Sequence, residues 1–182
     1  MEIKTVPVGD LMCNCYLIIK NNHVLVVDPG DDAFVIKQSI GELKVDGIVV
    51  THHHFDHVGA LKEIQECYST FIYDYHNLEE KTHTIGEFMF DVIYTPGHTE
   101  DSITLYFKDE NVMFTGDFLF YQSIGRTDLF GGDEVKMMES LKKIKQYPSS
   151  ITFYPGHGPK STLEYEKQHN YFLQMCDEVS FL

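Results

Sequence analysis

The sequence is short of basic residues and of long apolar runs. Lys and Arg number 14 against 28 Asp and Glu, which gives a formal net charge of −14 at pH 7. A chain of this charge repels phosphate backbones, and no run of Lys or Arg reverses the sign locally, so nucleic-acid binding is not expected. No apolar run could cross a bilayer, and the first residues lack the apolar core of a signal peptide, so no membrane partner is expected.

Cysteine is also scarce. The four cysteines, Cys13, Cys15, Cys67 and Cys176, have spacings that match neither a disulfide framework nor a zinc ribbon. A reducing compartment fits such a chain best, so we expect a cytoplasmic protein. The length of 182 residues and the hydrophobic fraction of 43% predict a single domain over residues 1–182 with a packed core.

Hydrophobic periodicity predicts alternating blocks of strands and helices. The expected strands cover residues 3–8, 15–19, 24–27, 45–50, 71–73, 88–94, 102–107, 112–114 and 151–154, and the expected helices cover 31–43, 58–67, 133–146 and 162–176. Asp133 is the expected N-cap of the third helix. Strands followed by a helix, twice over, predict two β-rich halves with outer helices, which is an α/β sandwich.

Side chains that can bind a metal gather in residues 51–57, with the sequence THHHFDH. The apolar, β-branched run 45–50 before them predicts a strand, and the run 58–67 after them has helical spacing. The stretch therefore lies where a strand ends and a helix begins, which is where α/β proteins place their chemistry. A His-rich surface loop is the alternative, but it would not explain further histidines in glycine-flanked turns elsewhere.

Three such turns follow predicted strands. His98 comes after Gly97, Asp117 after Gly116, and His157 after Gly156. Glycine lets the backbone turn sharply and brings the next side chain back over the strand ends. One histidine of this kind is usually only a turn residue, whereas two of them, an aspartate and the His-rich stretch together indicate a metal site.

Spacing divides the candidate ligands between two metals. His52 and His54 are two residues apart and face the same way in an extended segment, so they can share one metal. The first expected set is His52, His54 and His98, the second is Asp56, His57 and His157, and Asp117 bridges them, while His53 should point away. Mixed nitrogen and oxygen ligation suits Zn²⁺, and also Fe or Mn, and the lack of a cysteine argues against a closed structural zinc site.

The pattern His-x-His-x-Asp-His at 52–57, followed by His98, Asp117 and His157, resembles the metallo-β-lactamase superfamily over nearly the whole chain. The segments PGHT at 96–99, GRTD at 125–128 and PGHGP at 155–159 resemble the short glyoxalase II-like hydrolases of that superfamily. This resemblance implies a four-layered αββα sandwich with a dinuclear site. It also implies a thioesterase that acts on hydroxyacylglutathione-type substrates such as S-lactoylglutathione.

The implied mechanism gives roles to further residues. Two metals lower the pKa of a shared water, and the bridging hydroxide attacks the thioester carbonyl. Asp56 is both a ligand and the expected catalytic proton acceptor. Asp28, at the family's early Asp, either caps the next helix or orients a metal ligand from outside the coordination sphere. Arg126 either binds the glutathione part or pairs with Asp128 to stiffen its loop.

Several alternatives stay open at this point. One is a persulfide dioxygenase, which would use one iron on His52, His98 and Asp117. A phosphodiesterase of the same superfamily and a non-enzymatic metal-binding module are the others. A β-lactamase fits these loops less well. Full-length glyoxalase II enzymes bind glutathione largely through a further C-terminal helical domain, whereas one helix is expected after His157 here, so the thiol carrier is open. The aromatic residues of loop 118–132 either line a pocket or pack internally. Phe181 and Leu182 could pack internally or on a partner, so the oligomeric state is open as well.

Overall fold

The structure is a computed structural model that describes residues 1–177, and it forms two compact units. Unit 1 runs from Met1 to Val92 and unit 2 begins at Ile93. Phe181 and Leu182 lie outside the described residues. Within the described part of the chain, no helix has the length and apolar character needed to cross a membrane.

Unit 1 is a five-stranded mixed sheet with helices and a hairpin. The sheet has the order β1 (Glu2–Val8), β2 (Cys13–Lys20), β3 (His23–Val27), β4 (Lys44–Val49) and β5 (Ile72–Tyr73). The first three strands are antiparallel neighbours, and the β3–β4 and β4–β5 pairs are parallel. The helices are α1 (Ala33–Ile40), α2 (Phe55–Val58) and α3 (Leu61–Tyr68), and β6 (Thr82–Ile85) pairs with β7 (Phe88–Tyr94) as an antiparallel hairpin.

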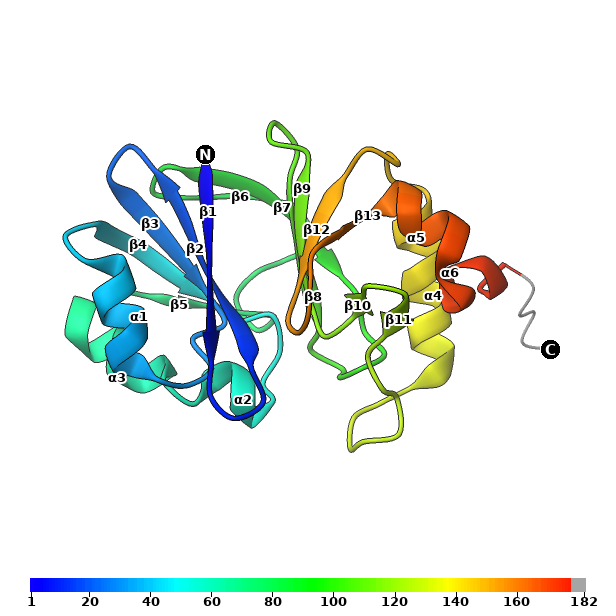
Figure 1. Cartoon of the computed structure of the whole chain (residues 1–182), viewed down its shortest axis with the longest axis horizontal. Coiled ribbons are helices and arrows are strands. Elements are labelled where there is room, and N and C mark those ends of the chain that lie inside the picture. The colour runs from blue at the N-terminus through cyan, green and yellow to red at the C-terminus, as the bar shows by residue number, and fades with distance from the viewer. Residues whose placement is uncertain (178–182) are drawn as a thin grey trace. The chain divides into compact units, whose positions relative to one another are not determined.

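The core of unit 1 lies between its sheet and the helices α1 and α3, which lie along one face of that sheet (Figure 1). Ile36, Ile40 and Ile64 from these helices are buried against Val24 and Val26 of β3. The parallel strands β3 and β4 end at the same edge, where the amide of Asp28 donates to the carbonyl of Val49 at 3.0 Å. This edge therefore brings Asp28 beside the start of the His-rich stretch.

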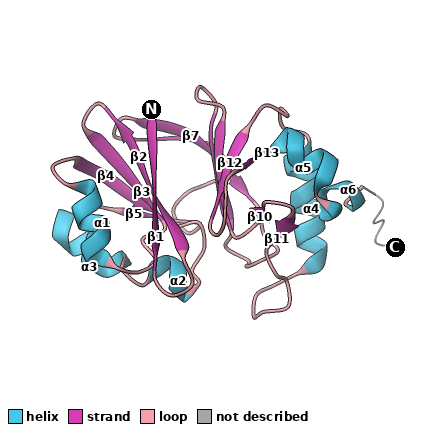
Figure 2. Cartoon of the chain, viewed as in Figure 1, coloured by secondary structure: helices cyan, strands magenta, loops and turns pink. Residues whose placement is uncertain are grey.

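Unit 2 repeats the plan of a sheet covered by helices. Its strands are β8 (Ile103–Phe107), β9 (Val112–Gly116), β12 (Thr152–Pro155) and β13 (Ser161–Thr162), with a small hairpin of β10 (Leu119–Phe120) and β11 (Ser123–Ile124). The β8–β9 and β12–β13 pairs are antiparallel and β9–β12 is parallel. The helices α4 (Glu134–Lys145), α5 (Leu163–His169) and α6 (Tyr171–Met175) lie together beside this sheet (Figure 2).

The core of unit 2 is formed by α4 and α6 against the sheet. Met137 and Leu141 of α4 and Leu173 of α6 are fully buried with Phe153 of β12. The parallel strands β9 and β12 end at one edge, where the amide of Gly156 donates to the carbonyl of Gly116 at 2.9 Å. The residues that follow these two glycines, an aspartate and a histidine, are thereby delivered to the same edge.

Each predicted strand and helix has a counterpart in the structure, but two helices are divided, and β6, β10, β11 and β13 are strands that were not predicted. The expected helix 58–67 is divided: Val58 ends α2, and α3 begins at Leu61. Glycine is needed at position 59 between them, because a Cβ there would lie 2.3 Å from the carbonyl oxygen of Gly30. The expected helix 162–176 divides at Asn170, whose side chain caps α6. The Asp133 cap is confirmed, since its carboxylate accepts from the amide of Lys136 at 3.0 Å.

Candidate functional site

Asp28 is a buried carboxylate at the end of β3. It is 2% exposed and its φ of 51° is unusual for a residue with a side chain. Oδ1 accepts from the amide of Thr51 at 2.7 Å, and Oδ2 accepts from the Thr51 hydroxyl at 2.6 Å and from Nδ1 of His57 at 2.9 Å. Helix α1 begins after Asp32 instead, so the capping alternative for Asp28 is wrong and the carboxylate serves the His-rich stretch.

His57 has its ring direction fixed by this contact. The ring is fully buried, and donation from Nδ1 to Asp28 leaves Nε2 as the nitrogen that carries a lone pair. Nε2 lies 3.9 Å from the carboxylate of Asp56, whose side chain is 15% exposed. A neutral imidazole of this tautomer and an adjacent carboxylate are suitable ligands for one metal ion.

His52 is oriented by the same carboxylate through one hydroxyl. Because the Thr51 hydroxyl donates to Asp28, its oxygen can accept from Nδ1 of His52, which lies 3.2 Å away. Nε2 of His52 then lies 3.2 Å from Nδ1 of His54. Two nitrogens bound to one tetrahedral metal at about 2.0–2.1 Å lie roughly 3.3 Å apart, so this pair has the separation of two ligands of one ion.

His53 takes a different direction from its neighbours. Its Nε2 lies 3.3 Å from the carboxylate of Asp74, and its side chain is 38% exposed. Its ring also lies near that of His76, with the centroids 5.8 Å apart. The ring is thus engaged on the Asp74 side, which agrees with its expected role as a non-ligand.

Cys13 is a neighbour of the His-rich stretch that the sequence interpretation missed. Its buried Sγ lies 3.6 Å from Nδ1 of His57, so the expectation that no cysteine accompanies the ligand-type residues is wrong for unit 1. The thiol lies on the Nδ1 side of the ring, together with Asp28. Gly30 completes this close approach, since a Cβ there would lie 1.8 Å from the carbonyl oxygen of Asp56 and 3.2 Å from Sγ of Cys13.

In unit 2, one carboxylate oxygen lies between two histidines. Oδ2 of Asp117 is 3.6 Å from Nε2 of His98 and 3.6 Å from Nε2 of His157. The side chains of Asp117, His98 and His157 are 11%, 4% and 27% exposed, so all three are largely shielded from solvent. This placement would let a single carboxylate serve two metal ions, one held by each histidine.

His98 is oriented by a backbone carbonyl. Nδ1 donates to the carbonyl oxygen of Arg126 at 2.8 Å, which directs Nε2 toward Asp117. Two glycines allow the close approach on either side. At Gly97, which has a φ of 143°, a Cβ would lie 2.5 Å from Cα of Met137, and at Gly125 a Cβ would lie 1.7 Å from the carbonyl oxygen of Asp117.

The Arg126 side chain forms a two-point ion pair with Asp128. Nε lies 2.7 Å from Oδ1 and Nη2 lies 2.8 Å from Oδ2, and both side chains are mostly exposed. The guanidinium lowers the pKa of Asp128 to about 2 and is itself held charged, with a raised pKa, by the hydrogen bonds to that carboxylate. The Arg126–Asp128 pair expected under the loop-stiffening alternative is therefore present, and a contact of Arg126 with substrate stays a prediction.

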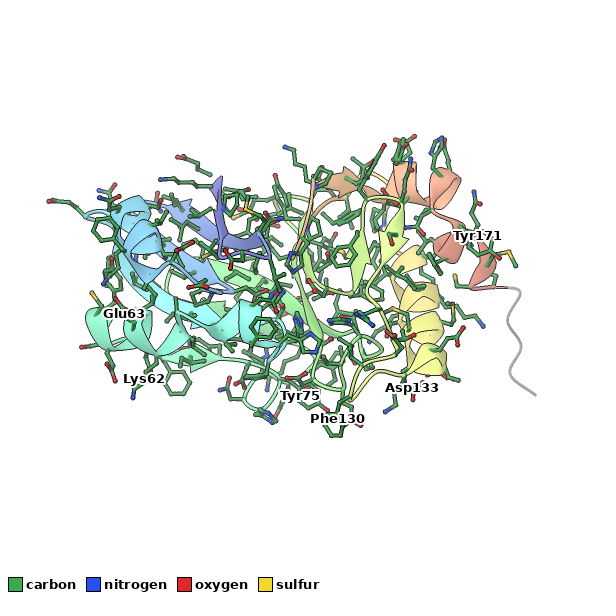
Figure 3. All side chains as sticks on the ribbon, turned by 60° about the horizontal axis from the view of Figure 1, so that its bottom comes forward. Lys62, Glu63, Tyr75, Phe130, Asp133 and Tyr171 are labelled. Carbon is green, nitrogen blue, oxygen red and sulfur yellow. The ribbon has the colours of Figure 1, made fainter. Side chains whose placement is uncertain are left out.

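The aromatic residues of loop 118–132 have different environments. Phe120 meets the ring of His157 edge-on, with the centroids 6.3 Å apart, while Tyr121 stacks on Tyr165. Phe130 is fully exposed and projects from the loop that leads to Asp133 at the start of α4 (Figure 3). Only Phe120 among these three contacts a ligand-type side chain through its ring.

Comparison with known proteins agrees with these features. The family model described as the metallo-beta-lactamase superfamily matches residues 8–70 and 71–157, and so extends through both units. The chain is similar to the hydroxyacylglutathione hydrolase GloC of Haemophilus influenzae, at 29% identity over 95% of this chain and 98% of that protein.

Two solved structures are also similar. The crystal structure of the BLEG-1 B3 metallo-beta-lactamase has 34% identity and a TM-score of 0.91, and the match covers 94% of this chain and 99% of that one. The crystal structure of TTHA1623 in a di-iron-bound form has 31% identity and a TM-score of 0.84, over 93% and 99% of the two chains. The predicted fold class is confirmed, and the chain belongs to the metallo-β-lactamase superfamily.

Proposed function

We propose that this chain is a dinuclear metallohydrolase that cleaves hydroxyacylglutathione-type thioesters, with S-lactoylglutathione as the reference substrate. The observation that carries the proposal is the position of Oδ2 of Asp117, 3.6 Å from Nε2 of both His98 and His157. A carboxylate oxygen at equal distance from two imidazole nitrogens is suited to bridging two metal ions. Similarity over nearly full length to a hydroxyacylglutathione hydrolase supports the substrate class.

The seven candidate ligands divide between two ions in this proposal. One ion would be held by His52, His54 and His98, the other by Asp56, His57 and His157, with Asp117 shared. The 3.2 Å separation between the facing nitrogens of His52 and His54 supports their assignment to a single ion. The donors are imidazole nitrogens and carboxylate oxygens, a set that fits Zn²⁺ best and also fits Fe or Mn. Iron stays a candidate because the chain is similar to a protein whose structure was solved in a di-iron-bound form.

Bound metal ions would supply a hydroxide near neutral pH and polarise the thioester carbonyl. The chain's own residues carry out the remaining tasks. Asp28 holds the rings of His57 and, through Thr51, of His52 in the tautomer that presents Nε2. Asp56, partly exposed at the start of α2, accepts the proton of the attacking water. The C–S bond breaks, and the thiolate leaves and takes up a proton, so water and thioester give acid and thiol.

The substrate class is tested by one comparison on a single metal-loaded preparation. Hydrolysis of S-lactoylglutathione, of a β-lactam and of bis(4-nitrophenyl) phosphate is measured together with oxygen uptake on glutathione persulfide. We expect the highest kcat/KM for the thioester, at least tenfold above the others. Dominant oxygen uptake would indicate the persulfide dioxygenase instead, and dominant phosphate diester cleavage the phosphodiesterase.

Hydrolysis of β-lactams is the second candidate. It is favoured by the 34% identity and the TM-score of 0.91 to the BLEG-1 B3 metallo-beta-lactamase. The same nucleophile and the same carbonyl polarisation would open a strained amide ring. A kcat/KM for a β-lactam that exceeds that for S-lactoylglutathione would replace the first proposal by this one.

A further inference from the structure

Glu166 is a buried carboxylate in α5 that takes no part in the proposed chemistry. It is 0% exposed, and its two oxygens receive three hydrogen bonds. Oε1 accepts from the hydroxyl of Ser161 at 2.5 Å. Oε2 accepts from the amide of Gln122 at 2.8 Å and from Nδ2 of Asn170 at 3.0 Å. The carboxylate thus joins α5 to the hairpin of β10 and β11.

Asn170, between α5 and α6, adds a second connection to the same hairpin. The residue is fully buried, and its Nδ2 also donates to the carbonyl oxygen of Ser123 at 3.1 Å. Its Oδ1 accepts from the amides of Phe172 and Leu173 and so caps α6. Gln122 has a φ of 55°, a conformation that a residue with a side chain adopts only when its surroundings hold it. The C-terminal helices therefore fix the backbone at Gln122 and Ser123.

The residues that follow this fixed point contact two ligand-type residues of unit 2, Asp117 and His98, through their backbone. The amide of Gly125 donates to the carbonyl of Phe118 at 3.2 Å, and the backbone of Gly125 lies against the carbonyl of Asp117. The next residue, Arg126, presents the carbonyl oxygen that accepts from Nδ1 of His98. Only four positions separate Gln122 from Arg126, so a displacement at the first would be transmitted to the second.

We propose that Glu166 and Asn170 are positioning residues for His98 and Asp117, acting through residues 122–126. The proposal rests on the assignment of His98 and Asp117 as metal ligands under the proposed function. Glu166 holds the amide end of this segment, and the carbonyl end holds the imidazole of His98 in the tautomer that presents Nε2. The short C-terminal helices would thus support the proposed metal ligands through this segment.

Two substitutions that hardly change side-chain volume should differ in their effect on these hydrogen bonds: one keeps them and the other breaks them. In Glu166→Gln, the amide oxygen can accept from Gln122 and Asn170, and the amide nitrogen can face the Ser161 hydroxyl, which can accept as well as donate. All contacts are therefore kept. In Asn170→Asp, Oδ1 still caps α6, but an oxygen replaces Nδ2 and faces the Ser123 carbonyl and the Glu166 carboxylate. Acceptor then faces acceptor.

The test measures the ligands without any thioester. In the apoprotein, the imidazole ¹⁵N shifts of His98 report which nitrogen carries the proton, and chelator competition with Zn²⁺ reports metal affinity. For Asn170→Asp we expect the ¹⁵N shifts of His98 to show that the proton is no longer confined to Nδ1. We also expect the Zn²⁺ affinity to fall about 10- to 100-fold. Glu166→Gln should stay within about threefold of the parent. Glu164→Gln, an exposed change on the same helix, should also stay within that range.

Two results would overturn the proposal. One is a folded Asn170→Asp protein with the parent's His98 signals and Zn²⁺ affinity; the other is a loss in Glu166→Gln as large as in Asn170→Asp. Should Asn170→Asp fail to fold, Glu166→Leu, which removes both acceptor oxygens, is compared with Glu166→Gln by the same two measurements. Because neither measurement uses a substrate, the result is independent of whether the chain hydrolyses thioesters.

Discussion

Oδ2 of Asp28 accepts from Nδ1 of His57 at 2.9 Å, and the two side chains are 2% and 0% exposed. The same oxygen accepts from the Thr51 hydroxyl, which can in turn accept from His52. One buried carboxylate therefore sets the direction of two imidazole rings. A ring whose Nδ1 is bound in this way presents Nε2, so the arrangement of ligands in unit 1 depends on a residue that is not itself proposed as a ligand.

Asp28→Asn should weaken metal binding with little loss of side-chain volume. The amide nitrogen would face Nδ1 of His57, which then has to accept, so the proton moves to Nε2 and blocks the nitrogen proposed as the ligand. We expect the Zn²⁺ affinity to fall about 10- to 100-fold, measured by chelator competition. Asp74→Asn, which alters the contact of the non-ligand His53, serves as the matched control and should bind Zn²⁺ as the parent does. Unchanged affinity in Asp28→Asn would show that the carboxylate does not orient His57.

Asp117→Ala should remove the shared carboxylate. Since Oδ2 is equally distant from Nε2 of His98 and of His157, its loss affects both proposed ions. We expect the metal content after reconstitution, measured by elemental analysis, to fall below that of the parent, and kcat for S-lactoylglutathione to drop by at least about 100-fold. Full occupancy together with full activity in this variant would contradict a two-metal centre.

The pair of Arg126 and Asp128 makes two predictions that separate its roles. Because the guanidinium lowers the pKa of Asp128 from 3.8 to about 2, the paired carboxylate stabilises the loop above about pH 4, and this contribution is lost as the pH falls toward 2. The carboxyl titration of Asp128, followed by NMR, should move upward toward its ordinary value in Arg126→Met.

If stiffening the loop is the whole role of the Arg126–Asp128 pair, Arg126→Met and Asp128→Asn should raise KM equally. A rise in KM confined to Arg126→Met would assign the guanidinium to substrate binding.

The cysteines should differ in reactivity. Cys67 is exposed, whereas Cys13, Cys15 and Cys176 are buried, and burial raises the pKa of the Cys15 and Cys176 thiols above their ordinary value. At pH 8 the native protein should take up one iodoacetamide label rapidly, at Cys67, and the denatured protein four, as counted by mass spectrometry. Rapid labelling of Cys13 in the native state would show that its contact with His57 opens.

The sequence was informative where function depends on contiguous residues. The alternation of His52 and His54 and the strand-to-helix position of residues 51–57 are local properties, and the structure places their facing nitrogens 3.2 Å apart. The glycine turns before His98, Asp117 and His157 were also local signals, because each directly follows a predicted strand, and the structure places the strands before Asp117 and His157 at one sheet edge. The division of the seven ligands between two ions stays a prediction.

The contacts that orient these residues could not be predicted in the same way. The acceptor for His98 is the backbone carbonyl of Arg126, and a carbonyl has no sequence signature. Cys13 was missed because the expected strand began at residue 15, and because a buried strand position does not show which side chain it meets. The hairpin of β10 and β11 was read as loop, because its strands have two residues each and lie in a glycine-punctuated segment.

The account's central claim is that hydrolysis needs two metal ions held by both sets of ligands. The most direct measurement is a titration of the apoprotein with Zn²⁺, in which hydrolysis of S-lactoylglutathione and bound metal are followed on the same samples. We predict that kcat rises until about two equivalents per chain are bound and then stays constant, and that Asp117→Ala shows no such plateau. Full activity at one bound ion per chain, or no thioester hydrolysis at two, would contradict the claim.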